Sequence, residues 1–122
     1  MELNHKFMGE ILNYPEMGIE SEKRIYIIDN TDISWIEYLS HGYMESSTTI
    51  SIYEVMHLIK KWAYDKGYEI RSGYRGYSNL FKITPWGLDC VEQFNEKTEF
   101  EAVYQAGLWV FEKLKEQNNG TK

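Results

Sequence analysis

The last helix of the chain, together with the turn that starts it, constrains the fold most strongly. Thr98-Glu99-Phe100-Glu101 has the pattern of a capping box, in which the Thr98 hydroxyl accepts from a first-turn N–H and Glu101 reaches back to the Thr98 N–H. The residues that follow predict a helix over about 99–117. Its apolar face is formed by Phe100, Val103, Tyr104, Gly107, Val110, Phe111 and Leu114.

A second helix is predicted over 52–66, because Ser51-Ile52-Tyr53-Glu54 is another capping box and Gly67 is a typical helix stop. Each of the two helices has a single apolar stripe, which requires a sheet or another helix to cover it. The stripe of this second helix consists of Ile52, Val55, Met56, Ile59, Trp62 and Ala63.

The N-terminal segment is predicted to form a short helix over 2–13. It should end at Tyr14-Pro15, because the residue before a proline avoids the helical region. Residues 15–23 are expected to form a polar loop. The apolar face of this helix would comprise Leu3, Phe7, Met8 and Ile11.

The next segment contains a predicted hairpin. Arg24 to Ile28 is rich in β-branched and aromatic residues and reads as a strand, and 29–32 favour a turn through their short polar side chains. Residues 33–39 suit either a strand paired with the first or a short helix, and their Trp, Ile and Tyr content favours the strand. Ser46 to Thr49 is predicted to be a polar linker.

Three short strands are predicted between the two long helices, over 68–73, 80–84 and 89–94. A six-residue hairpin loop, 74–79, joins the first two, and a tight turn at Pro85-Trp86-Gly87 joins the last two. Because both connections are short, we expect the strands to pair antiparallel.

The order α-β(β)-α-β-β-β-α predicts an α+β fold, in which helices pack on an antiparallel meander as a layered sandwich. The chain has 122 residues, which suits one domain over 1–117, and a disordered tail is expected at 118–122. Ten Tyr, five Phe and four Trp indicate a packed core, because disordered chains are poor in aromatic residues.

The charge of the chain disfavours nucleic acid as a partner. Its formal net charge is −6 and its lysines and arginines are scattered, so we expect no binding to duplex DNA. No apolar run approaches the length that spans a membrane, and the N-terminus lacks the pattern of a signal peptide. These features predict a cytoplasmic protein with no membrane partner.

No catalytic, metal or cofactor site is predicted. His5, His41 and His57 lack the spacing of paired metal ligands. Cys90 is the only cysteine, which excludes an intramolecular disulfide, and inside a strand it is expected to be a half-buried packing residue. The segment from Gly73 to Gly76 lacks the Gly-Lys-Ser/Thr ending of a phosphate-binding loop.

Three segments resemble a known family. Asn4-His5-Lys6-Phe7-Met8-Gly9 is similar to the opening of the phage ABA-sandwich domain family, and Lys66-Gly67-Tyr68 is similar to the exit from its central helix. The stretch from Thr98 to Ala106 resembles its closing helix. The resemblance implies layers of helices around a sheet and an origin in a phage or prophage. It implies no activity and assigns no functional residues.

The candidate binding residues are Tyr74, Arg75, Tyr77 and Trp86. Tyrosine and arginine are enriched in binding hot spots, and a hairpin loop would present the first three outward. Trp86, at the next turn, would add a large apolar surface. The alternative is that Tyr74, Tyr77 and Trp86 fold back over the edge of the sheet.

The resulting hypothesis is a phage-encoded accessory protein that binds a host or phage protein, for example to inhibit a host defence system. The rival is a binder of a small molecule such as a nucleotide signal, or a weak enzyme acting on it, with Arg71, Arg75 or Lys82 on phosphate. A homodimer through the 24–38 hairpin is a further expectation, and its apolar patch would include Ile27, Trp35 and Ile36.

Overall fold

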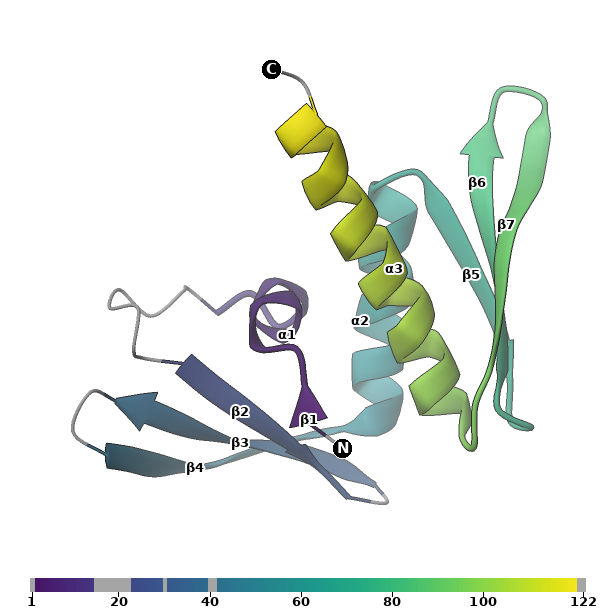
Figure 1. Ribbon diagram of the computed structural model, residues 1–122. Helices are drawn as coiled ribbons and strands as arrows, with labels where there is room; N and C mark the ends of the chain where they lie inside the picture. The colour runs from purple at the N-terminus through teal and green to yellow at the C-terminus, as the bar shows by residue number, and fades with distance from the viewer. Residues whose placement is uncertain (1, 15–22, 30, 40–41, 121–122) are drawn as a thin grey trace. The chain divides into compact units, whose positions relative to one another are not determined.

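The computed structural model describes residues 2–14, 23–29, 31–39 and 42–120, and the chain divides into two compact units, Met1–Val55 and Met56–Lys122 (Figure 1). Both units contain antiparallel strands and helices, so the predicted α+β class, with helices packed on antiparallel sheet, is confirmed. The meander expected as one sheet is two sheets in the structure, one in each unit. The prediction of one domain over 1–117 stays a prediction.

The first unit, unit 1, is built on a four-stranded sheet in the order β1-β2-β3-β4, with every neighbouring pair antiparallel. Helix α1 lies against β2. The elements are β1 (Glu2–Leu3), α1 (His5–Ile11), β2 (Lys23–Ile28), β3 (Asp32–Leu39) and β4 (Gly42–Ser51).

Helix α1 is shorter than predicted at both ends. Asn4 is its N-cap, and the Asn4 side chain accepts a hydrogen bond of 2.9 Å from the Phe7 N–H. Leu12 is the C-cap, and Asn13 then takes a left-handed conformation with φ 59°, which ends the helix before Tyr14. The predicted helical start at residue 2 was wrong, because Glu2–Leu3 pairs with β2. All four predicted face residues are nevertheless buried, namely Leu3, Phe7, Met8 and Ile11.

The predicted turn at 29–32 is confirmed where it is described. The Asp29 carboxylate accepts from the N–H groups of Thr31 and Asp32, each at 2.9 Å, and these bonds hold the pKa of Asp29 below its usual range. The turn returns the chain as β3, so residues 33–39 form the strand that the sequence favoured, with Trp35 opposite Tyr26.

The linker predicted at Ser46 to Thr49 was wrong, because these residues belong to β4, where Thr49 pairs with Ser34 of β3 and the register between the two strands shifts at 46–48. A strand at the end of a sheet needs little apolar alternation, and the threonines at 48 and 49 are exposed β-branched residues that suit it. Most of the polar loop predicted at 15–23, and His41, lie outside the described residues.

Trp35 is part of the core of unit 1. It is 6% exposed, and its ring lies 5.3 Å from the Tyr14 ring and 6.0 Å from the Tyr26 ring, measured between centroids. The expectation that Trp35 contributes to an exposed dimer patch was therefore wrong. Ile27 is 44% exposed, as that patch requires.

The second unit, unit 2, contains a three-stranded antiparallel meander in the order β5-β6-β7, and α3 contacts all three strands from one face (Figure 1). Helix α2 begins in unit 1 and continues into unit 2. The elements are α2 (Ile52–Asp65), β5 (Tyr68–Gly73), β6 (Tyr77–Thr84), β7 (Gly87–Asn95) and α3 (Glu99–Gly120).

The hydroxyl half of each predicted capping box is present in the described part of the chain, without the return bond from the glutamate. The Ser51 hydroxyl accepts from the Tyr53 N–H at 3.2 Å, and the Thr98 hydroxyl accepts from the Glu101 N–H at 3.1 Å. Gly67, at φ 92°, follows the end of α2 as expected. The tail was expected to begin at residue 118, whereas α3 continues to Gly120, and residues 121–122 lie outside the described residues. Among the described helices, none is long and apolar enough to cross a bilayer.

Candidate functional site

The sheet of unit 2 has one covered face and one open face. Tyr68, Ile70 and Leu80 are buried on the face that meets α3, where the Ser78 hydroxyl donates to the Ala102 carbonyl at 2.7 Å. Since side chains alternate along a strand, Arg71 and Phe81 project from the other face. There the Arg71 guanidinium lies 5.3 Å from the Phe81 ring centroid and 2.6 Å from the Glu69 carboxylate.

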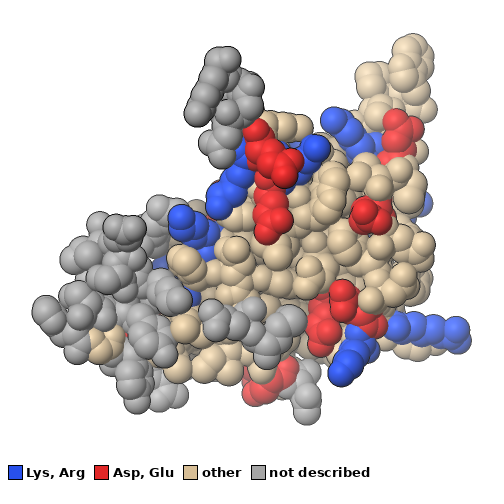
Figure 2. All heavy atoms as spheres, viewed as in Figure 1, with Lys and Arg blue, Asp and Glu red and all other residues tan. Residues whose placement is uncertain are grey.

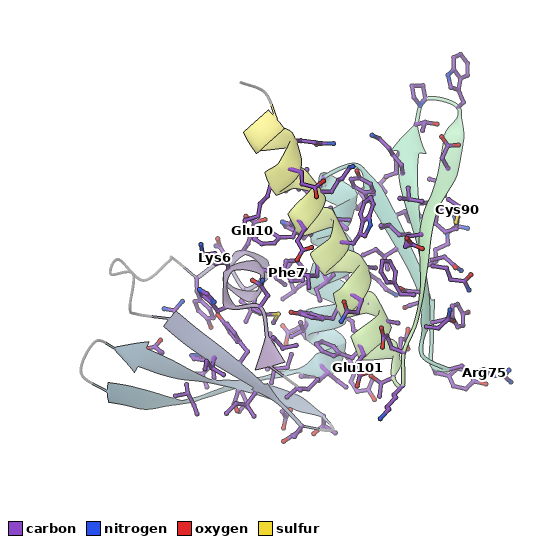
Figure 3. All side chains as sticks on the ribbon, in the orientation of Figure 1. Lys6, Phe7, Glu10, Arg75, Cys90 and Glu101 are labelled. Carbon is purple, nitrogen blue, oxygen red and sulfur yellow. The ribbon has the colours of Figure 1, made fainter. Side chains whose placement is uncertain are left out.

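The turn between β5 and β6 carries two of the four predicted binding residues, Tyr74 and Arg75, and a third, Tyr77, is the first residue of β6 and is 39% exposed. The turn consists of Tyr74, Arg75 and Gly76, so the predicted six-residue loop 74–79 was too long. Tyr74 is 82% exposed, and the Arg75 guanidinium lies 5.9 Å from its ring centroid. Figure 3 shows Arg75 extending away from the sheet at this turn. Tyr74 therefore does not fold back over the sheet.

The backbone fixes this turn to the segment before α3. The Gly76 N–H donates to the Gly73 carbonyl at 3.1 Å, and the Gly76 carbonyl accepts from the Glu96 N–H at 2.7 Å. A Cβ on Gly76 would collide with the Glu96 carbonyl oxygen, and the Tyr77 ring occupies the space that a Cβ on Gly73 would need. The two glycines thus permit a close-packed turn, whose backbone carries Tyr74 and Arg75.

Trp86 lies at the other end of the sheet. It is 95% exposed in the turn between β6 and β7, and the Thr84 hydroxyl holds that turn by accepting from the Trp86 N–H and donating to the Gly87 carbonyl. The structure therefore does not bring Trp86 together with Tyr74 and Arg75. A meander places successive turns at opposite ends, here about 25 Å apart along β6.

Strand β7 is exposed almost throughout, a feature that the sequence analysis missed. Of its residues only Phe94 is half-buried, and Cys90 is exposed on the side away from α3 (Figure 3). The prediction that Cys90 is a half-buried packing residue was wrong, because β7 ends the sheet and its outer face has no covering helix in unit 2. Charged and polar residues that a covered strand would not hold occur in the run Leu88-Asp89-Cys90-Val91-Glu92-Gln93. This pattern in the sequence indicates an exposed strand.

The cations proposed for phosphate binding do not converge. Lys82 pairs with Tyr68 in the ladder and lies over its ring on the α3 side, with its Nζ 5.9 Å from the ring centroid. Arg71 projects from the opposite face and is ion-paired with Glu69. Arg75 lies at the turn, so the three groups have no common ligand position on this sheet.

Charge is mixed on the face of the chain shown in Figure 2, where Lys and Arg lie interspersed with Asp and Glu. His57 is exposed on α2. Over 2–14, 23–29, 31–39 and 42–120, no group of three or more His, Cys, Asp or Glu side chains is placed to hold a metal ion.

Comparison of the chain with protein-family models, with curated proteins and with solved structures finds no significant match. The resemblance to the phage ABA-sandwich domain family therefore stays a prediction, and the function is inferred from the geometry of the site.

Proposed function

We propose that this protein acts by binding another protein through the sheet of unit 2, with Tyr74 and Arg75 as contact residues. The observation that carries the proposal is the β5–β6 turn, where an 82% exposed tyrosine and a neighbouring arginine project from a backbone fixed by Gly76 and Glu96. Aromatic and arginine side chains provide large contact areas, and a fixed backbone reduces the ordering cost of binding.

The class of partner that we propose is suggested by the family resemblance, which implies an origin in a phage or prophage. On that basis we propose a phage or prophage accessory protein whose partner is a host or phage protein in the cytoplasm, with inhibition of a host defence system as one form of the activity. The exposed Trp86 provides a second apolar contact at the far end of the sheet.

The test is affinity purification from a host lysate with the unmodified protein and with Tyr74→Ala/Arg75→Ala. A matched control is Lys61→Ala/Tyr64→Ala, which removes an exposed lysine and an exposed tyrosine side chain from α2. We expect a partner that is retained by the unmodified protein and the control and lost by the turn variant. Retention by all three, or by none, contradicts the assignment of this turn as the contact.

Binding of a nucleotide-like ligand, or weak catalysis on it, is the second candidate, and the divergence of Arg71, Arg75 and Lys82 disfavours it. A thermal-shift screen with nucleotides and cyclic nucleotides distinguishes the two, since a ligand that binds the folded state raises the unfolding temperature. We expect no shift at millimolar ligand, and a saturable shift would favour this candidate instead.

A further inference from the structure

We propose that β7 accepts an extended, basic segment of the partner protein as a fourth strand of the sheet of unit 2. This inference rests on the proposed function, because it specifies how the same sheet would engage its partner. In strand addition, main-chain hydrogen bonds supply affinity, and the alternating side chains of the added segment supply specificity.

The edge of β7 is open to such pairing. β7 is the last strand in the order β5-β6-β7, so within the described part of unit 2 one of its edges has no neighbouring strand. Eight of its nine residues are exposed and the other, Phe94, is half-buried. It contains neither lysine nor proline, two residue types that commonly protect sheet edges against pairing.

The register of the sheet locates the added strand. Phe81 pairs with Cys90 and Leu80 pairs with Glu92, so Val91 is an extra residue at a bulge that interrupts regular pairing. The stretch Gly87–Cys90 is regular, lies next to the turn that carries Trp86, and is the part of β7 on which we place the added strand.

The side chains of this stretch define the chemistry of the partner. Leu88, 38% exposed, pairs with Ile83 on the open face, whereas Asp89 pairs with Lys82 on the face toward α3. Residues opposite each other in a ladder share a face, so the added strand would place apolar residues beside Leu88 and a residue of opposite charge beside Asp89. An alternating basic and apolar segment fits this pattern.

Charge favours such a partner over a second copy of the chain. β7 contains two carboxylates, Asp89 and Glu92, and no lysine or arginine. Lys82 faces Asp89 in the ladder, but Glu92 faces the apolar Leu80. Two copies joined through β7 would gather the carboxylates of both strands at one seam, where like charges are destabilising. A basic segment would instead neutralise them, and Trp86 would pack against its end.

The test uses a short capped peptide of alternating lysine and valine, with an alternating glutamate and valine peptide as the control. We expect the basic peptide alone to bind and to protect the amides of Gly87–Cys90 from hydrogen exchange. Asp89→Lys/Glu92→Lys should weaken binding at least about tenfold. Glu112→Lys/Glu116→Lys, which makes the same change in net charge on the exposed side of α3, should leave binding unchanged.

Equal binding of both peptides, no binding of the basic one, or no protection of Gly87–Cys90 overturns the proposal. A dimer in sedimentation that Asp89→Lys/Glu92→Lys abolishes also overturns it, because a second copy then occupies the edge. A partner retained from lysate that is lost with Tyr74→Ala/Arg75→Ala, but not with Asp89→Lys/Glu92→Lys, overturns strand addition and leaves the proposed function standing.

Discussion

Gly76 and Glu96 make a backbone contact that joins the β5–β6 turn to the segment before α3. The Gly76 carbonyl accepts from the Glu96 N–H at 2.7 Å, and the Glu96 carbonyl lies where a Cβ on residue 76 would be. Only glycine fits this position, because its φ of 91° is also one that other residues rarely adopt. The contact holds the backbone of the turn that carries Tyr74 and Arg75, so it connects the packing of unit 2 to the candidate site.

Gly76→Ala should therefore destabilise unit 2 by more than the strain of a positive φ alone would. Gly67 is the matched control, since its φ is 92° but a Cβ there would meet no atom within 4 Å. We expect Gly67→Ala to lower the free energy of unfolding by about 1 kcal/mol and Gly76→Ala by about 3 kcal/mol. Chemical denaturation of both variants measures the difference, and equal losses would mean that the contact with Glu96 is unimportant.

Ser78 should contribute a buried hydrogen bond that its neighbour Ser72 does not match. The Ser78 hydroxyl is 0% exposed and donates to the Ala102 carbonyl in the first turns of α3, whereas Ser72 is half-buried and donates to the Glu99 carboxylate. Ser78→Ala should cost about 1–2 kcal/mol, because it leaves the Ala102 carbonyl without this donor. Ser72→Ala, measured by the same denaturation curves, should cost less, and the reverse order would contradict this assignment.

Much of the fold was predictable because its signals are local. The capping residues Ser51 and Thr98 and the stop at Gly67 specify where α2 and α3 begin and where α2 ends. Strand β4 was missed because its residues 46–49 are polar, and their place in a strand depends on the pairing of the flanking residues with β3. Asn4 is a typical N-cap residue, so the start of α1 was visible in the sequence and was overlooked.

The candidate site was predictable only in part. Exposure of Tyr74 and Trp86 follows from their positions in turns, and the structure agrees with it. Tyr74 and Trp86 lie far apart because successive turns of a meander lie at opposite ends of its strands. The same rule, applied to the predicted strands, would have predicted this separation. The exposure of β7 depends on what covers each face of the sheet, a tertiary property that residue patterns indicate weakly. The fixed backbone at Gly76 depends on contact with a distant residue, Glu96, and has no local signal.

Tyr26 should make the stability of the protein sensitive to alkaline pH. Burial raises the pKa of Tyr26 above its usual 10.0, and the nearby Arg24 charge opposes that rise. The folded state therefore holds the phenolic proton to higher pH than the unfolded state. The contribution is complete below about pH 10 and is lost as pH rises through the folded-state pKa.

Tyr26→Phe tests this linkage. It should reduce the fall in unfolding free energy above pH 10, whereas Tyr53→Phe, at a 67% exposed position, should leave that fall unchanged. At neutral pH the Tyr26→Phe variant should differ by less than about 1 kcal/mol, because it removes one hydroxyl and keeps the buried ring in place. Urea denaturation across this pH range measures both effects, and identical pH profiles for all three proteins would contradict the assignment.

Phe100 should be among the most costly residues to truncate. It is 1% exposed in the first turn of α3, and its ring stacks on Tyr104 with centroids 6.2 Å apart, so Phe100→Ala removes a buried ring and leaves a cavity. We expect a loss of about 3–5 kcal/mol.

Trp62 is half-buried against Phe111, at 6.4 Å between ring centroids, so Trp62→Ala should cost less, about 2 kcal/mol. Tyr64→Ala, at a 59% exposed position on the same helix as Trp62, should change stability by less than about 0.5 kcal/mol. Denaturation monitored by circular dichroism gives all three values, and a loss below about 1 kcal/mol for Phe100→Ala would mean that this face of α3 is not part of the core.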